Sequence, residues 1–205
     1  MIHTALQNRF SNQSYFRLVR TMIEIKPLTQ FDAVRFREIS SGYTSPAMYK
    51  VSRSETDSLT TISLNLQELD AVYKKQWQPN IEMETYYSRV IEQGLSLGIY
   101  DGNRMVGIAI AEKRTWNRTL WVWEFHIDQD YHQKGLGRQL IDRLAEIGRT
   151  ANCRVIVCET QNTNVPAIRF YRKVGFEVGA IDLSYYTNKD VTDFEVAVFM
   201  KRFIK

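Results

Sequence analysis

The chain has 205 residues, of which 44% are hydrophobic and 24% charged, so it can bury a core and its composition excludes general disorder. Its formal net charge is +4, and three arginines within residues 1–21 supply most of it, leaving 24 basic against 23 acidic residues elsewhere. A nearly neutral domain without a basic stripe argues against a nucleic-acid partner. The sequence shows no apolar run long enough to predict a membrane span and no apolar signal core, so we expect a cytoplasmic protein without a membrane partner.

Cys153 and Cys158 have a spacing that fits neither a zinc site nor a redox motif. Both fall in or beside a predicted strand, where we expect buried free thiols in a reducing compartment. The three histidines are scattered along the chain. The sequence therefore predicts no metal site.

Residues 1–21 are polar and basic with isolated aromatic side chains. They are expected to form a loose arm or a docking helix, or to precede a true start at Met22, and these alternatives stay open. Residues 22–205 are expected to form a single domain.

The predicted elements begin with a strand at residues 22–28, which Pro27 ends, and a short helix at 29–40, which Thr29 or Asp32 caps. Residues 49–63 are interpreted as an extended arm. Helical spacing of apolar residues then predicts two further helices, which cover residues 65–77 and 79–94.

The second half of the chain contains most of the predicted strands. An Asp-Gly turn joins two of them into a hairpin, a third long strand follows, and a glycine turn then opens an amphipathic helix. The later elements are a buried strand of the parallel type, a helix with a proline in its first turn, and two closing strands. The hairpin strands cover residues 95–100 and 104–116, and the third long strand covers 118–128. The buried strand covers 153–160, the proline-containing helix 164–175, and the two closing strands 176–188 and 194–203. This order predicts an α/β fold with a mixed, mostly antiparallel sheet of about seven strands and helices on both faces.

The segment "DYHQKGLGRQLIDRL", residues 130–144, places Gly135 and Gly137 at the start of a helix. Glycine turns at helix N-termini bind phosphate because their N–H groups and the helix dipole attract anions. A kinase-type loop would need lysine directly after the last glycine, where Arg138 stands. A dinucleotide loop would need a small residue at Leu140. A plain helix start without a ligand remains an alternative.

Together, "YHQKGLGR" at residues 131–138 and "NVPAIRFYRKVGF" at residues 164–176 resemble the GNAT superfamily of N-acetyltransferases, over residues 95–205 and more weakly from Met22 onward. The runs "WNRTLWVWEFHID", "ETQNTN" and "YYTN" resemble its streptothricin acetyltransferase branch. The loop departs from the family pattern at His132, where the family has Arg or Gln. The resemblance implies the GNAT fold and acetyl-CoA as cosubstrate, with no metal.

The resemblance also implies that the coenzyme is held mainly by backbone N–H groups. The residues expected to contact it are Phe125, His126, Ile127, His132, Gln133, Lys134, Gly135, Leu136, Gly137, Arg138, Asn164 and Tyr171. The N–H of Ile127 is expected to stabilise the oxyanion. Lys134 and Arg138 are interpreted as phosphate contacts or as ordinary surface charge, and Asn164 as a coenzyme contact or a helix cap. If the side chain of His132 contacts the coenzyme, His132→Arg should change its affinity more than His132→Ala.

The family's chemistry is direct attack of an amine through a tetrahedral intermediate, which requires a base, an oxyanion donor and an acid. Tyr171 corresponds to the family's general acid, with core packing as its alternative role. Glu159, at the end of a strand, is the candidate base, directly or through a water; a helix cap or a substrate salt bridge are its alternatives. Glu124 shares a strand face with His126 and Asp128 and is the rival base or an amine binder.

The implied acceptor is the primary amine of a small cationic molecule, streptothricin-like or polyamine-like, which would make the activity one of antibiotic resistance. Aromatic faces and acids are expected to bind it. The candidate contacts are Trp116, Trp123, Glu124, Asp182 and Tyr185, with Trp121 and Tyr186 as further aromatic walls. The alternatives are acetylation of a protein N-terminus or lysine, and a non-catalytic acyl-CoA-binding module. Residues 194–203 are the candidate contact for a homodimer.

Overall fold

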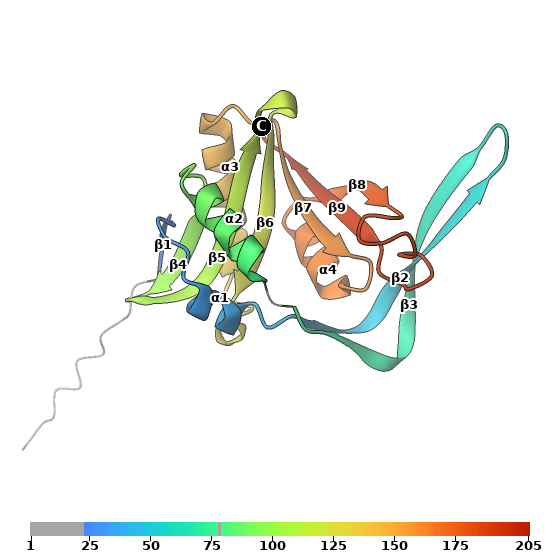
Figure 1. The fold of residues 1–205 in the computed structure, drawn as a ribbon, viewed down its shortest axis with the longest axis horizontal. Helices are drawn as coiled ribbons and strands as arrows, with labels where there is room; N and C mark the ends of the chain where they lie inside the picture. Colours follow the sequence, from blue (N-terminus) through green and yellow to red (C-terminus); the bar gives the residue numbers. More distant parts are fainter. Residues whose placement is uncertain (1–22, 78) are drawn as a thin grey trace, which may run out of the picture.

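The computed structural model describes residues 23–77 and 79–205, so the expectations for residues 1–21 lie outside the described residues. Seven strands form one sheet in the order β1-β4-β5-β6-β7-β9-β8, in which only β6 and β7 are parallel neighbours (Figure 1). Their bounds are β1 Ile23–Pro27, β4 Leu97–Asp101, β5 Arg104–Arg114, β6 Thr119–Ile127, β7 Val155–Gln161, β8 Glu177–Asp182 and β9 Ala197–Phe203. The predicted mixed, mostly antiparallel sheet is confirmed.

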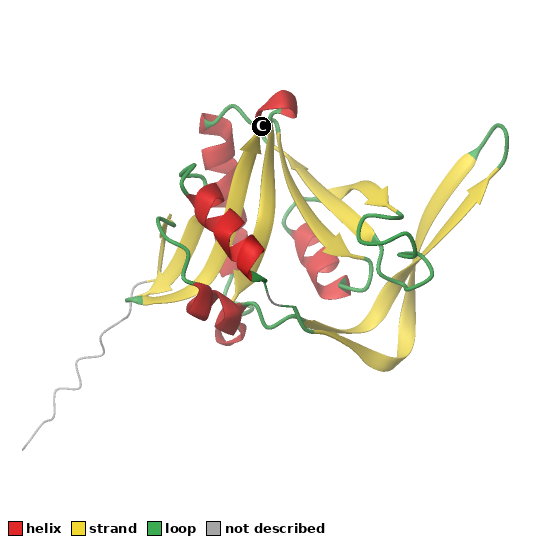
Figure 2. Cartoon of the chain, viewed as in Figure 1, coloured by secondary structure: helices red, strands yellow, loops and turns green. Residues whose placement is uncertain are grey.

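The helices cover both faces of this sheet (Figure 2). One core cluster lies on each face of the sheet. Phe36 and Tyr87 pack with Ile108 of β5 in one cluster, and Leu140 and Ile168 belong to the other. The first cluster is covered by α1 (Ala33–Ile39) and α2 (Ile81–Ile91), and the second by α3 (Leu136–Thr150) and α4 (Val165–Lys173). The buried residues of α3 recur every three or four positions, which gives the helix one apolar face.

Helix ends follow the capping signals in the sequence. The side chain of Asp32, rather than Thr29, accepts a hydrogen bond from the N–H of Arg35 and starts α1. Asn164 caps α4, which has Pro166 in its first turn. Gly175 follows the end of α4 with φ of 92°, a conformation that favours glycine.

The expectation of a helix over residues 65–77 is wrong, because this segment belongs to a long strand. β2 (Tyr43–Glu55) and β3 (Thr60–Lys75) pair antiparallel as a separate two-stranded sheet, which we call the arm. The apolar residues that suggested a helix do not share a buried face: the side chains of Leu66 and Val72 are 47% and 54% exposed. Pairing with β2 therefore overrides the local helical pattern.

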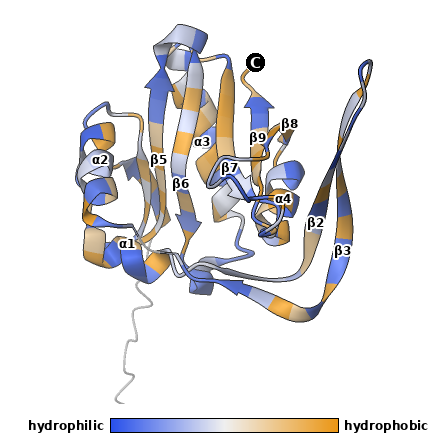
Figure 3. Cartoon of the chain, turned by 45° about the vertical axis from the view of Figure 1, so that its right-hand side comes forward, coloured by the Kyte–Doolittle hydropathy of each residue, from blue (hydrophilic) through white to orange (hydrophobic). Residues whose placement is uncertain are grey.

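The arm is attached to the domain by a buried amide. The side-chain Nδ2 of Asn162 donates to the carbonyl of Tyr49 at 2.8 Å, and its Oδ1 accepts from the N–H of Val196 at 2.8 Å. The N–H of Tyr49 donates in turn to the carbonyl of Asn162 at 2.9 Å. The far end of the arm is largely hydrophilic and extends away from the sheet (Figure 3). A two-stranded sheet is marginal alone, so this attachment orders the base of the arm.

Candidate active site

The sheet divides between its two parallel strands. The register of β6 and β7 runs from Thr119↔Val155 to Val122↔Cys158 and stops there. Beyond this point β6 stays paired with β5, and β7 with β9, so the two strands diverge toward their carboxyl ends (Figure 1). We call these diverging ends the wedge, which comprises residues 123–127 of β6 and 159–161 of β7. Ligands in α/β sheets commonly bind beyond the carboxyl ends of strands.

The backbone of β6 presents hydrogen-bonding groups to the wedge. The N–H of Asp128 donates to the carbonyl of Val106 on the β5 side at 2.8 Å. Because antiparallel strands direct the backbone groups of successive residues to opposite neighbours, those of His126 also face β5, and those of Phe125 and Ile127 face the wedge. The backbone groups of two of the three expected contact residues, Phe125 and Ile127, are therefore directed toward the wedge.

The glycine loop forms an anion cradle at the start of α3. Gly135 is the N-cap, with φ of 80° and no side-chain hydrogen bond to the helix, so the N–H groups of the first turn remain available to a ligand. Gln133 also has a positive φ, of 59°. A Cβ on Gly137 would lie 2.9 Å from the ring of Phe170. This cradle fits the pyrophosphate of the coenzyme that the sequence resemblance implies.

The polar side chains around the cradle already have protein partners. Nε2 of His132 lies 2.9 Å from the carbonyl oxygen of Ile127, so this side chain joins the loop to the end of β6. Arg138 donates to the carbonyl of Lys173 at 2.7 Å, and Nζ of Lys134 lies 4.5 Å from the ring centre of Tyr131. Asn164 caps α4, where its side-chain Oδ1 accepts a hydrogen bond from the N–H of Ala167. The cradle therefore consists mainly of backbone groups.

Tyr171 is buried beside the wedge, within a group of aromatic rings. Its ring centre lies 6.2 Å from that of Phe125, 5.4 Å from that of Phe170 and 5.2 Å from that of Phe176. Burial raises the pKa of the phenol well above its usual range, and the neighbouring Cys158 raises it further. Tyr171 therefore stays protonated at neutral pH.

Glu159 is half-buried at the wedge end of β7. Burial raises the pKa of its carboxyl to about 7, and the charges of Glu124 and Glu195 also raise it. The hydroxyl of Tyr186 donates to this carboxyl, and Lys75 lies near enough to lower its pKa. Asn164, not Glu159, caps α4, so the helix-cap alternative for Glu159 is excluded. A carboxyl that titrates near neutral pH can accept a proton under physiological conditions.

Glu124 faces the same region from β6. It is 7% exposed, and its Oε1 accepts a hydrogen bond from the hydroxyl of Tyr87. Its Oε2 lies 2.7 Å from Nε2 of His126. Asp128, which we expected on the same acidic face, forms ion pairs with Arg35 at 2.6 Å and with Arg104. Asp128 thus has structural partners, whereas Glu124 lies close enough to Glu159 for its charge to raise the pKa of the Glu159 carboxyl.

The base of the arm adds residues that sequence reasoning did not identify. Nζ of Lys75 and the hydroxyl of Tyr73 both donate to Glu195, at 2.5 Å and 2.8 Å, and Lys75 lies 5.8 Å from the ring centre of Tyr186. The hydroxyl of Tyr43 lies 2.6 Å from Oγ1 of Thr163. These partners are more than a hundred positions apart along the chain, so no local pattern indicates them. The arm therefore borders the site at the Glu159 end.

The expected acceptor contacts are only partly brought together. Tyr185 packs on Tyr186, which contacts Glu159, with ring centres 5.2 Å apart. Trp123 lies at the start of the wedge, where its Nε1 donates to Glu112 at 2.9 Å. Asp182 ends β8 and accepts from the N–H of Ser184.

Trp116 is placed apart from these residues. It is 85% exposed in the turn between β5 and β6, at the end of β6 that is remote from the wedge. Trp121 lies between that turn and the wedge, where its ring contacts Trp123 and Arg114. The expected homodimer strand, β9, has a paired neighbour on each side and offers no free edge.

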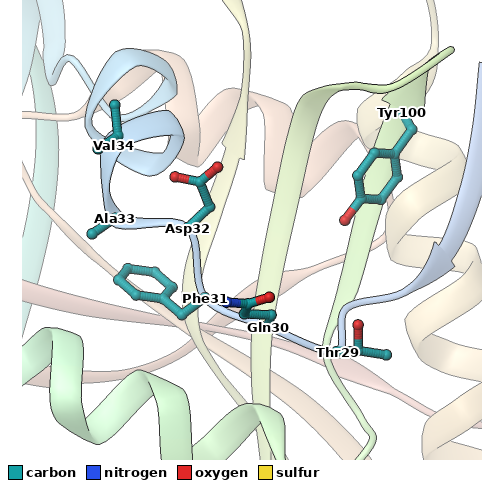
Figure 4. Close-up of a pocket in the computed structure, with 7 residues that line it drawn as sticks. All are labelled: Thr29, Gln30, Phe31, Asp32, Ala33, Val34 and Tyr100. Carbon is teal, nitrogen blue, oxygen red and sulfur yellow. The ribbon is translucent and has the colours of Figure 1, made fainter.

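A separate shallow pocket lies between α1 and β4 (Figure 4). Its lining residues are Thr29, Gln30, Phe31, Asp32, Ala33, Val34 and Tyr100, none of which belongs to the wedge. Both cysteines are free and buried, as expected. Among the described residues, no group of histidines, cysteines and acids is arranged to hold a metal ion. No helix in the described part of the chain is long and apolar enough to cross a membrane.

Residues 64–176, more than half of the chain, match the model of the acetyltransferase (GNAT) family. Streptothricin acetyltransferase A of Bacillus subtilis strain 168 is 30% identical over 128 residues, which cover 62% of this chain and 71% of the relative. The ribosomal protein bS18 alanine N-acetyltransferase of Salmonella typhimurium strain LT2 is 28% identical over 103 residues, or 50% of this chain and 68% of the relative.

A solved structure shares the fold over nearly its whole length. It is a Bacillus anthracis strain Ames protein, provisionally named a streptothricin acetyltransferase, in complex with acetyl coenzyme A. The two align with a TM-score of 0.70 and 24% identity, covering 90% of this chain and 99% of the other.

Proposed function

Because the chain belongs to the acetyltransferase (GNAT) family, whose cosubstrate is acetyl-CoA, we propose that it transfers acetyl to a primary amine of a small cationic molecule. The observation that carries this proposal is the pair of carboxylates at the wedge. Glu124 on β6 and Glu159 on β7 approach the site from both strands, and the negative charge of each raises the pKa of the Tyr171 phenol. Two carboxylates attract a positively charged amine, and the coenzyme fits the cradle and backbone groups next to them.

Backbone groups would hold the coenzyme, which supplies an electrophilic thioester. The N–H groups of the first turn of α3 would bind the pyrophosphate, because they point outward at a positive helix end. The groups of Phe125 and Ile127 that face the wedge would bind the pantetheine arm. In this arrangement the N–H of Ile127 is the donor for negative charge on the acetyl oxygen.

Glu159 and Tyr171 would perform the proton transfers near the sulfur. Glu159 accepts a proton from the amine nitrogen, since its carboxyl has a pKa of about 7 and is ionised in a useful fraction at neutral pH. Tyr171 is still protonated when the C–S bond breaks, because its pKa is raised, and it then donates its proton to the departing sulfur. The hydrogen bond from Tyr186 orients the carboxylate of Glu159.

The acceptor would lie on the α2 side of the sheet, between the acids and the tyrosines. Tyr185 and Tyr186 offer aromatic faces beside Glu159, and such faces favour cations. Streptothricin is the first candidate, since the Bacillus subtilis relative is named for it. Acetylation of an antibiotic amine would make this a resistance enzyme. The Salmonella relative supports a second candidate, the N-terminal alanine of a protein.

The acceptor is tested by following free thiol while the protein is incubated with acetyl-CoA and separate amines: streptothricin, spermidine, lysine, and a peptide with an N-terminal alanine. We expect the highest kcat/KM with streptothricin or spermidine. A peptide preferred by ten-fold or more would replace the small-molecule proposal with N-terminal acetylation. A matched peptide with a blocked N-terminus controls for lysine acetylation.

A further inference from the structure

We infer that His126 is a further catalytic residue: with Glu124 it forms a carboxylate–imidazole dyad that takes the first proton from the acceptor amine. This inference rests on the proposed function. It assigns a role to the side chain of a residue whose backbone groups face β5 rather than the wedge.

The dyad is defined by two hydrogen bonds to one carboxylate. Nε2 of His126 lies 2.7 Å from Oε2 of Glu124, and the hydroxyl of Tyr87 on α2 donates to Oε1. Glu124 is 7% exposed, so its charge is poorly solvated and is balanced by these donors. A carboxylate hydrogen-bonded to one ring nitrogen fixes the tautomer of an imidazole and stabilises the imidazolium that forms when the other nitrogen gains a proton.

Aromatic packing holds the ring of His126 in place. It stacks on Trp77, with ring centres 6.2 Å apart and planes at 15°, and meets the edge of Phe36 at 5.5 Å and 89°. The charged groups near it are Glu124 on its own strand and, one position further along the same face, Asp128 paired with Arg35 of α1. The side chain is 25% exposed, so a substrate can reach it. Nδ1 is the nitrogen left to meet that substrate.

The reaction needs two proton acceptors on the amine side. An ammonium group loses one proton before it can attack and a second as the amide forms, while the sulfur gains one when the C–S bond breaks. We assign the first proton to Nδ1 of His126, the second to Glu159, and the proton on sulfur to Tyr171. One proton is then released to solvent for each C–N bond formed, so the exchange balances.

A pair of matched amines tests the dyad. Ethylamine is protonated at pH 7, whereas 2,2,2-trifluoroethylamine is largely neutral and does not need its first proton removed. We expect His126→Gln to lower kcat/KM for ethylamine by ten-fold or more, given general-base contributions of about 10² to 10⁴. The same substitution should lower kcat/KM for trifluoroethylamine less than three-fold. Glu124→Gln should show the same selectivity, but it also removes a charge that attracts the ammonium group, so His126→Gln decides the test. Acetyl-CoA affinity should stay unchanged in His126→Gln.

An equal loss of kcat/KM with both amines would indicate that His126 has only a structural role. No loss of kcat/KM with either amine would indicate that His126 has no role in the reaction. Either result overturns the inference. If the wild-type protein releases no thiol with any of the amines tested, the proposed function is wrong, and the inference about the dyad, which rests on it, is wrong as well. Histidine nitrogen-15 NMR gives an independent readout, with the His126 signals assigned from the His126→Gln variant. We expect the tautomer with hydrogen on Nε2, and the Nδ1–H tautomer would contradict the dyad.

Discussion

Gly137 and Phe170 are so close that a Cβ on residue 137 would lie 2.9 Å from Cζ of the phenylalanine ring. This contact presses the first turn of α3 against α4. The ring of Phe170 also stacks on Phe125 of the wedge and touches Tyr171. The anion cradle and the candidate general acid therefore both pack against the ring of Phe170, so a substitution in the cradle should also affect Tyr171.

We predict that Gly137→Ala lowers acetyl-CoA affinity about ten-fold and destabilises the protein by about 1–3 kcal/mol, the usual range for an overpacked site. The added methyl group must displace Phe170 or the first turn of α3. Isothermal titration and chemical unfolding measure the two effects. The double variant Gly137→Ala with Phe170→Leu should recover most of the affinity, and failure to recover would show that the ring is not the obstacle.

His132 gives a second prediction, which revises the expectation from the sequence. Because its Nε2 bonds to the carbonyl of Ile127, the side chain holds the loop against β6 rather than reaching freely for phosphate. We therefore expect His132→Ala to weaken acetyl-CoA binding several-fold, and His132→Gln, which retains a donor, to bind more nearly like the wild type. Equal binding by all three proteins would show that this hydrogen bond does not support the loop.

The fold was largely predictable because most elements carry local signals. The Asp-Gly turn, the proline and glycine at the ends of α4, and the apolar strand β7 each appear where the sequence placed them. The arm was predicted incorrectly over residues 65–77, since Leu66, Leu69 and Val72 have helical spacing although β2 holds them in a strand. Strand pairing at a distance decides such a segment, and a single-sequence pattern does not contain it.

The candidate site was predictable only in part, for a similar reason. The resemblance to the acetyltransferases pointed to Glu159 and Tyr171, and strand alternation placed Glu124 and His126 on one face. Their hydrogen bonds to each other and to Tyr87 depend on how α2 crosses the sheet. The bond from Tyr186 to Glu159 likewise depends on the loop between β8 and β9, which no periodicity describes.

The pKa of Glu159 leads to a third prediction. If its carboxylate is the base, kcat/KM should fall on the acid side with a midpoint near pH 7, because burial raises that pKa to about 7. Tyr186→Phe removes a hydrogen bond that favours the charged form, so the midpoint should move to higher pH. With trifluoroethylamine, which does not need the His126–Glu124 dyad, Glu159→Gln should abolish the midpoint near pH 7, and a midpoint that persists there would assign it to another group.

The same shift has a consequence for stability. The pKa of Glu159 is higher in the folded protein than its ordinary value of 4.5, so folding favours the protonated form. The contribution of Glu159 to the free energy of unfolding is therefore greatest below about pH 4.5 and is lost as the pH rises through about 7. The free energy of unfolding of the wild type, compared with Glu159→Gln, should fall across this interval. A difference between the two proteins that is independent of pH would contradict the assignment.

Tyr171→Phe gives a fourth prediction about the acid. The change should lower turnover by ten-fold or more, in line with general-acid contributions of about 10² to 10⁴, while the packed ring keeps the fold intact. Thermal unfolding and acetyl-CoA binding serve as controls, and both should remain close to the wild type. Phe176→Leu is a matched change in the same aromatic group and should reduce stability more than turnover. Unchanged turnover in Tyr171→Phe would leave Tyr171 as a packing residue.

The central claim is that this protein transfers acetyl from acetyl-CoA to an amine, and one assay tests it most directly. Purified protein is mixed with acetyl-CoA, with and without streptothricin or spermidine, while free thiol and the mass of the amine are followed together. We expect thiol release that depends on the amine and is matched by an equal amount of acetylated amine. Measurable acetyl-CoA binding without thiol release for any amine would contradict the claim and favour a non-catalytic acyl-CoA-binding module.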